Sequence, residues 1–276
     1  MNKLNRVEFH VDHNVKPKHI EEILFFFRNG IFLNKRDLMS ELNRIGHNIH
    51  PRHLSKNLSI LRYFGILKFE NDSFTITKIG LSIQRQLNFN KDIFYDLMHY
   101  LYYTTWDFSN QNTIYFSWSY KNICNLLWES KSSKVNRKRL AGELLILAHE
   151  KFGSKAISIS HEAITGVFNW VKALNPPFIE DTKINKLGNG KKHCSLELFV
   201  LAIDYLYHLL DLNYKTPILV DDFKKELICK LCLLKESNFN NMFSLTLKTF
   251  KFVQKHYGEW GTSLILQKRV KIEDLC

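Results

Sequence analysis

The chain has 276 residues, of which 45% are hydrophobic and 24% are charged, and its formal net charge is +12. A chain of this length and apolar content can bury one large or two ordinary cores, which excludes an intrinsically disordered protein. The excess of lysine and arginine favours an anionic partner, with nucleic acid as the first expectation and an anionic membrane surface as the second.

The sequence carries no sign of export or of membrane insertion. No stretch approaches the roughly 18 consecutive apolar residues of a membrane span. The first residues, MNKLNRVEFHVDHN, lack the apolar core of a secretory signal. The five cysteines are odd in number and irregularly spaced, which argues against a disulfide framework and for a reducing compartment. We therefore expect a cytoplasmic protein.

Three helices are predicted in the first quarter of the chain, after an arm over residues 1–16. Apolar residues recur at helical spacing from Pro17 to Asn29, and again after Asn34, which is a suitable N-cap. The third helix, residues 51–64, begins at a proline and ends before a glycine, as helices commonly do.

A β-hairpin is predicted directly after the third helix. Residues 66–70 and 73–77 both alternate between apolar and polar side chains, and Asn71 and Asp72 form the turn between them. This order of helix, turn, helix and hairpin, over residues 17–88, resembles the winged helix-turn-helix superfamily. The resemblance implies a DNA-binding domain, or a protein-binding module, because winged helices serve both purposes.

The third helix has two faces of different chemistry. Leu54, Leu58 and Leu61 share one face, and the opposite face carries cations and small hydroxyl groups but no acid. Such a face suits a DNA major groove, where arginine and serine reach base edges and lysine reaches phosphates. The alternative is the solvated side of an amphipathic helix. The residues predicted to bind DNA in this region are Lys35, Arg36, Arg52, Ser55, Lys56, Ser59, Arg62 and Lys68.

Residues 89–276 are predicted to form a mostly helical domain of unknown role, separate from a domain over residues 1–88. The expected fold class is therefore mainly α, with a winged helix-turn-helix and its small hairpin at the N-terminus. In the second domain the pattern predicts helices over 91–105, 119–129, 140–152, 160–174, 196–210, 222–236 and 240–256, and a strand over 263–272.

A basic run precedes the helix predicted over 140–152. The segment SKSSKVNRKR holds no acid. Its five cations are Lys131, Lys134, Arg137, Lys138 and Arg139. We expect either a second phosphate-binding loop or an ordinary solvated loop, since basic blocks of this kind are common on protein surfaces.

The remaining motifs do not predict a catalytic or metal site. Cys229 and Cys232 have the spacing of a zinc knuckle, but they lie inside an apolar helix, where cysteine behaves as a small hydrophobic residue. Asp221 and Asp222 precede a helix and are better explained as its N-cap and first-turn charge than as nuclease ligands. We expect no cofactor.

The sequence thus favours a protein that binds double-stranded DNA through its third helix, with the helical domain serving assembly, a protein partner or a second DNA contact. Transcription regulation, or a subunit of a DNA-modification or phage-defence system, fits this organisation. A homodimer on paired half-sites is one expected assembly. The alternative is a structural module whose winged helix binds protein, and an enzyme with a cryptic site in the helical domain is a third.

Overall fold

The structure is a computed structural model, and it describes residues 9–28, 30–109, 114–130, 132, 134–153, 159, 161–180, 183–184, 190–259 and 261–275. Lys131, one of the residues predicted to bind DNA, lies outside these ranges. Over the described residues the chain is mostly helical with small antiparallel sheets, as the sequence predicts. None of the helices in this part of the chain combines the length and the apolar character that a membrane span needs.

The α-helices are α1 Pro17–Leu24, α2 Lys35–Arg44, α3 Pro51–Tyr63, α4 Lys78–Phe89, α5 Lys91–Phe108, α6 Tyr115–Glu129, α7 Arg137–Phe152, α8 His161–Val171, α9 Leu196–Leu209, α10 Asp222–Cys232 and α11 Phe239–Thr249. Two short 3-10 helices are η1 Glu236–Asn238 and η2 Ile272–Asp274. The strands are β1 Leu67–Glu70, β2 Ser73–Ile76, β3 Ile179–Glu180, β4 Lys183–Ile184, β5 Ile218–Leu219, β6 Val253–Gly258 and β7 Gly261–Leu266.

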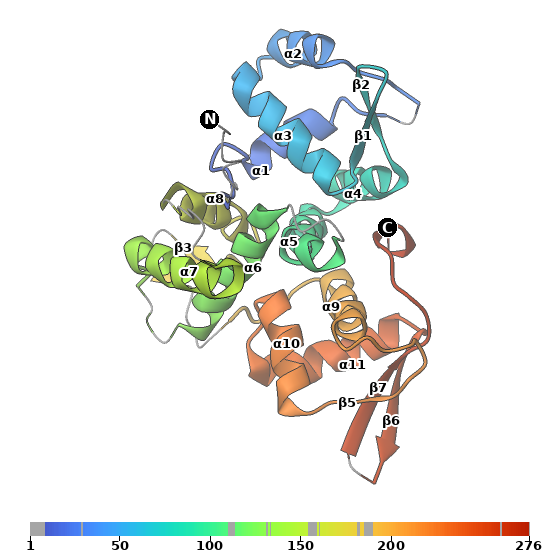
Figure 1. Cartoon of the computed structure of the whole chain (residues 1–276). Helices are drawn as coiled ribbons and strands as arrows, with labels where there is room; N and C mark the ends of the chain where they lie inside the picture. The colour runs from blue at the N-terminus through green and yellow to red at the C-terminus, as the bar shows by residue number, and fades with distance from the viewer. Residues whose placement is uncertain are drawn as a thin grey trace.

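These elements form three groups around α5 (Figure 1). The helices α1 to α4 lie at one end with the hairpin β1–β2, and α6 to α8 lie beside α5. The opposite end holds α9 to α11 and the sheet β5-β7-β6, from which the hairpin β6–β7 projects. After β7 the chain returns along the molecule, so that η2 packs against α4.

Local chemistry explains the elements of the first group. The side chain of Asn34 caps α2 by accepting a hydrogen bond from the N–H of Asp37. After α3 the chain turns at Gly65, whose φ is +68°. Asn71 and Asp72 both have positive φ, at 49° and 59°, which is the conformation of a two-residue hairpin turn. The predicted hairpin is therefore confirmed, with the two strands paired antiparallel.

The sequence suggests that the whole basic run is a loop, but its last three residues are helical. The helix α7 begins at Arg137, three residues earlier than predicted, because the side chain of Asn136 accepts a hydrogen bond from the N–H of Arg139. Arg137, Lys138 and Arg139 therefore occupy the first turn of α7. Cations are unfavourable at a helix N-terminus, so local propensity gives no reason for them there.

Other boundaries also differ from the prediction. The helix predicted over 240–256 ends at Thr249, and β6 begins at Val253. The predicted tail strand is β7, which ends at Leu266 rather than continuing to Ile272. The two strands pair along their whole length, and this pairing replaces the last turns of the expected helix. Nearer the N-terminus, α1 ends early at Leu24, α5 continues to Phe108, and α6 begins at Tyr115.

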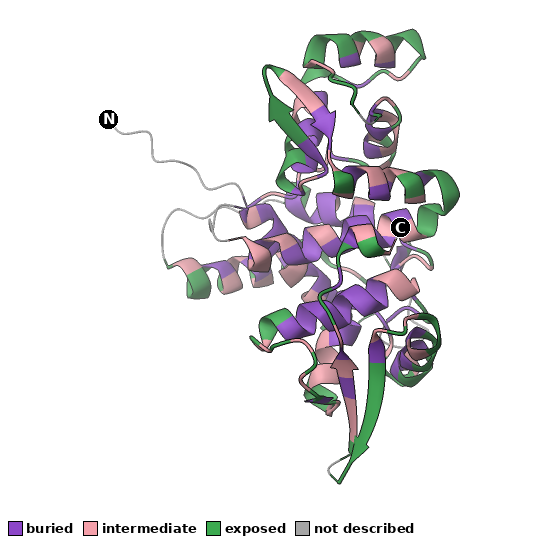
Figure 2. Cartoon of the chain, turned by 90° about the vertical axis from the view of Figure 1, so that its right-hand side faces the viewer, coloured by how far each residue is buried: buried purple, intermediate pink, exposed green. Residues whose placement is uncertain are grey.

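The buried side chains form one continuous cluster that runs from the first group of helices into the other two. Figure 2 shows the buried residues concentrated along the middle of the molecule, with α2 and β6 largely exposed. Phe64, at the end of α3, packs edge-on against Tyr102 of α5, with ring centroids 4.7 Å apart. The predicted domains 1–88 and 89–276 therefore share buried surface.

An ion pair is buried at the centre of this cluster. The Nζ of Lys191 lies 3.2 Å from Oδ1 of Asp96 in α5, and the side chains are 0% and 2% exposed. The second carboxylate oxygen accepts a hydrogen bond from the N–H of Ser195, at 2.7 Å. Asp96 thus fixes the segment that leads into α9. A buried charge is tolerated only while its partner is present.

We predict that Asp96→Leu lowers the free energy of unfolding by about 3–5 kcal/mol, because it leaves the Lys191 ammonium buried without a counter-charge. The double variant Asp96→Leu/Lys191→Met should recover most of that loss, since neither charge remains. Urea unfolding followed by circular dichroism measures both. A single variant as stable as the double variant would contradict this role for the ion pair.

A second polar group is buried in α5. The ring of His99 is fully buried, with Nε2 2.7 Å from the carbonyl oxygen of Leu231 and Nδ1 2.8 Å from the hydroxyl of Tyr120. A carbonyl only accepts, so Nε2 donates and Nδ1 accepts, which is the neutral ring. Burial lowers the pKa of His99 from 6.5 to about 4. The ring therefore stays neutral in the folded protein down to mildly acidic pH.

Stability should consequently fall as the pH is lowered. Between pH 6.5 and pH 4 the unfolded chain protonates His99 and the folded chain does not. The resulting loss in the free energy of unfolding is therefore absent above this pH window and complete below it. At about pH 5 the expected loss is on the order of 2 kcal/mol relative to neutral pH. Urea unfolding at the two pH values should show a weaker pH dependence for His99→Gln, and equal dependence in both proteins would refute the assignment.

Candidate nucleic-acid interface

The helix α3 exposes part of the polar face that its sequence predicts. Leu54, Leu58 and Leu61 are buried, as the periodicity requires. Ile60, which lines the hollow beside the N-terminal arm, is also buried, and Asn57 is fully buried. The side chains that remain exposed or half-exposed on the polar side of the helix are Arg52, Ser55, Ser59, Arg62 and Tyr63. We call these five residues the α3 face.

The α3 face has cations at both ends and hydroxyl groups between them. The Ser55 hydroxyl donates to the carbonyl of Pro51 at 3.0 Å, and the Ser59 hydroxyl donates to the carbonyl of Ser55 at 2.9 Å. Their oxygens still have lone pairs directed outward, and the hydroxyls can rotate to serve another acceptor. Among the described carboxylates, none lies within ion-pair distance of Arg52 or Arg62. Both guanidinium groups are therefore available to an anion.

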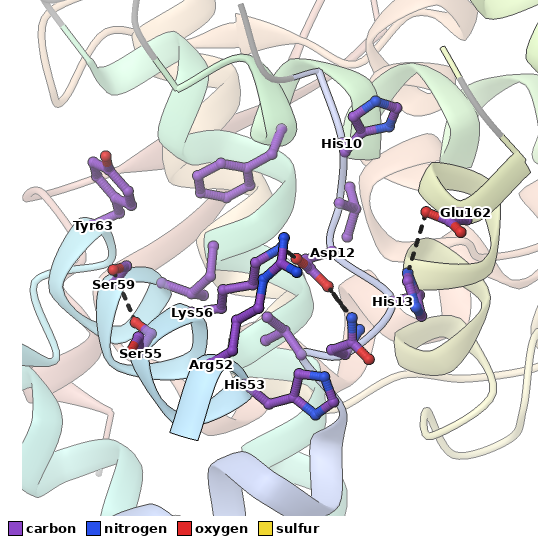
Figure 3. A pocket seen from close by; sticks show the side chains of 15 residues that line it. His10, Asp12, His13, Arg52, His53, Ser55, Lys56, Ser59, Tyr63 and Glu162 are labelled. Atoms are coloured by element: carbon purple, nitrogen blue, oxygen red, sulfur yellow. Dashed lines mark hydrogen bonds and ion pairs between the residues drawn. The ribbon is translucent and has the colours of Figure 1, made fainter. Parts of the chain in front are cut away.

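The arm, residues 9–15, lies along one flank of α3 (Figure 3). Phe9 anchors it by packing against Trp118 and Phe152, with ring centroids 5.7 and 5.3 Å away. Val11 crosses α8 at Gly166, where an added Cβ would lie 2.1 Å from the Val11 carbonyl oxygen. Only glycine permits this close approach. Between the arm and α3 is a hollow of about 540 Å³ that Glu162 of α8 also lines.

The arm neutralises one of the cations expected to face DNA. The ammonium of Lys56 forms an ion pair with the Asp12 carboxylate, which also accepts hydrogen bonds from the N–H and the side-chain amide of Asn14. Burial alone would raise the pKa of Asp12, but the hydrogen bonds and the charge of Lys56 outweigh it and hold the pKa below its ordinary value. The pair is thus intact at neutral pH, and Lys56 points to the arm rather than outward.

Two histidines lie close together at the start of α3. His50 caps the helix, its Nδ1 accepting from the N–H of Arg52 at 3.2 Å, and its ring lies 5.3 Å from that of His53. Burial lowers the pKa of His53, and the neighbouring charge of His50 lowers it further. His13 on the arm lies 3.8 Å from the Glu162 carboxylate, which closes the far side of the hollow.

The other cations predicted for this region differ in availability. Lys35 and Arg36 are exposed in the first turn of α2. Lys68 is exposed on β1, but its ammonium lies 2.9 Å from the Glu70 carboxylate of the same strand. A pair between two exposed side chains is weak and screened by salt, so it would yield readily to a phosphate.

The second basic set lies on the other side of α8 from α3. Arg137 donates to the Thr165 hydroxyl at 3.4 Å, and its guanidinium lies 5.2 Å from the ring centroid of Phe168. Lys134 and Lys138 are exposed. Arg139 is paired with Glu143, at 2.6 Å. The structure therefore does not join this set and the α3 face into one surface, because α8 separates them.

The described residues contain no group of three or more histidine, cysteine or carboxylate side chains arranged to hold a metal ion. Cys229 and Cys232 are buried in α10, and burial raises the pKa of Cys229 to about 12. Asp221 caps α10 by accepting from the N–H of Lys224 at 2.9 Å, the role predicted from sequence. Comparison with protein-family models, with curated proteins and with solved structures finds no match for this chain.

Sequence reasoning missed the arm as part of the candidate site. Asp12 and Lys56 are 44 positions apart, and nothing in the local pattern of either segment relates them. The one available signal is the alternation of Val7, Phe9 and Val11, which indicates an extended segment with a buried side. Val7 lies outside the described residues, while Phe9 and Val11 are buried.

Proposed function

We propose that residues 17–88 form a winged helix-turn-helix domain that binds double-stranded DNA, with α3 in the major groove and the hairpin β1–β2 as its wing. The observation that carries the proposal is the α3 face: a strip of the helix, open to solvent at least in part, that carries two arginines, two serines and no acid, and whose arginines have no ion-pair partner among the described residues. Arginine reads guanine in the major groove, and serine accepts or donates to either kind of base edge.

Phosphate contacts would come from the cations around this strip. Lys35 and Arg36 at the start of α2 lie where a first helix crosses the DNA backbone in helix-turn-helix complexes. The net charge of +12 adds a long-range attraction that concentrates the protein on DNA at low salt. The protein would then act in transcription regulation, or as the DNA-contacting subunit of a larger defence or modification complex, alone or as a homodimer.

A protein-binding module is the second candidate, and one observation favours it. Phe25, Phe32 and Phe69, all in the first group of elements, are 65%, 59% and 42% exposed. Exposed aromatic side chains of this size are often covered by a partner protein. The DNA measurements below separate the two candidates, since a protein-binding winged helix has no need of salt-dependent affinity for duplex.

We expect the full chain to bind a labelled random-sequence duplex with an affinity that falls on the order of a hundredfold between about 50 and about 200 mM salt. Fluorescence anisotropy measures this. Arg62→Ala should weaken binding and reduce the slope of log affinity against log salt by about 0.9, the effect of one lost phosphate contact. Arg52→Ala should instead reduce any preference among sequences.

Lys255→Ala is the matched control for Arg62→Ala, because it removes one exposed charge from β6 at the opposite end of the molecule. It should leave the salt slope unchanged. Equal losses in the two variants would show that binding follows net charge alone, and the absence of any salt-dependent affinity would reject the DNA-binding proposal.

The arm should limit the affinity for DNA. Asp12→Asn removes the charge that holds Lys56, so Lys56 can reach a phosphate; we expect several-fold tighter binding and a salt slope steeper by about 0.9. Asp222→Asn is the control, since it frees Lys225 on the distant helix α10 with the same change in net charge. If both variants bind DNA equally, Lys56 is not at the interface.

A further inference from the structure

A second pocket lies where the returning C-terminal segment meets α5. Its volume is about 680 Å³, within the range that encloses a small organic ligand. One wall is α5, from Tyr100 to Phe108, and another is α9, with Leu201 and Asp204. The end of α3 and the segment Arg269–Glu273 complete the lining. The pocket thus lies where the first group of elements, α5, α9 and the C-terminal segment meet.

The inner surface of this pocket is apolar and aromatic. Phe64, Tyr100 and Leu201 are all buried, and each contributes to the lining. The hydroxyls of Thr104 and Thr105 donate to carbonyls of their own helix, at 2.8 and 2.5 Å, and so leave only their acceptor side to a ligand. These walls favour a ligand whose larger part is apolar, either flat or branched, over a strongly hydrated ligand.

The polar groups of the pocket favour an anion at its rim. Arg269 and Lys271 are exposed, and neither side chain lies within ion-pair distance of a carboxylate among the described residues. Asp204 is buried and already accepts from the N–H of Val270 at 2.8 Å. Burial raises the pKa of Asp204, and the hydrogen bond from Val270 and the nearby charge of Arg269 act against that rise. Glu273 is the other acid in the lining, so the charged groups that reach solvent at the rim are two cations and one carboxylate, while Asp204 lies inside.

We propose that this pocket binds a small amphipathic acid: an aromatic or aliphatic body against α5 and α9, with a single carboxylate, sulfonate or phosphate held by Arg269. The affinity would come mainly from the apolar body. The charge pair with Arg269 would orient the ligand, because a half-exposed pair contributes little energy by itself.

The position of the pocket gives the ligand a further effect. Tyr63 lines both this pocket and the hollow beside the arm, and its ring belongs to the α3 face. A ligand that packs against the ring from this pocket would restrict the positions that the ring can take on the side of the hollow. This step, unlike the binding of the acid itself, rests on the proposed DNA-binding function: the ligand would act as an effector of DNA affinity.

The test uses 8-anilinonaphthalene-1-sulfonate, an aromatic sulfonate whose fluorescence rises on transfer from water to an apolar site, titrated into the full chain at neutral pH. We expect saturable binding with one site per chain. Arg269→Glu should weaken binding at least tenfold, and Thr105→Trp, which fills the pocket, should abolish it. Urea unfolding of each variant checks that the fold is intact, and Arg269 is exposed, so its replacement should not disturb the fold.

Lys255→Glu on β6 is the matched control for the charge reversal and should leave the probe affinity unchanged. Binding that does not saturate, or that weakens equally in Arg269→Glu and Lys255→Glu, would overturn the proposal. DNA affinity is then measured with and without saturating probe. An unchanged DNA affinity rejects the effector role and leaves the pocket assignment standing; a chain that binds the probe but no DNA rejects the proposed function instead.

Discussion

A helix that is buried on most of its sides needs partners inside the protein for the charged and strongly polar groups it carries, and α5 is such a helix. Its buried residues run from Phe94 to Trp106 and include Asp96 and His99. Asp96 is satisfied by Lys191 and the start of α9, and His99 by α6 and the end of α10. Because α4, α6, α8 and α9 all pack against α5, the position of α5 relates the three groups of elements, and these polar contacts fix α5 against α6, α9 and α10.

The packing around α5 also determines which side of α3 is exposed. Phe64 ties the end of α3 to α5, and Phe9 ties the arm to α6 and α7. With both ends held, Asp12 meets Lys56, and the part of α3 that stays open begins at the hollow beside the arm, which Arg52, Ser55, Ser59 and Tyr63 also line. The part of α3 that a partner can reach is therefore determined by aromatic contacts inside the protein.

The sequence predicts what depends on neighbouring residues. The caps at Asn34 and Asp221 and the turn at Asn71-Asp72 are local, and each is found where it was expected. What depends on distant pairing is not predictable from local pattern: β6 forms by pairing with β7, and nothing in the residues around Lys191 indicates that its side chain is buried beside Asp96. For the candidate site, periodicity identifies the polar face of α3, but the cover provided by the arm depends on a contact that the pattern does not encode.

The acids around the hollow also constrain how the two basic sets would be used on DNA. A duplex that continued from the α3 face toward α7 would pass Asp12 and Glu162, whose charges repel phosphates. A duplex that lies along α2 and α3 instead meets Lys35 and Arg36, which are exposed. If α3 enters the groove, the cations at the start of α7 therefore belong to a separate contact, with another stretch of nucleic acid or another anionic partner, rather than to an extension of the same footprint.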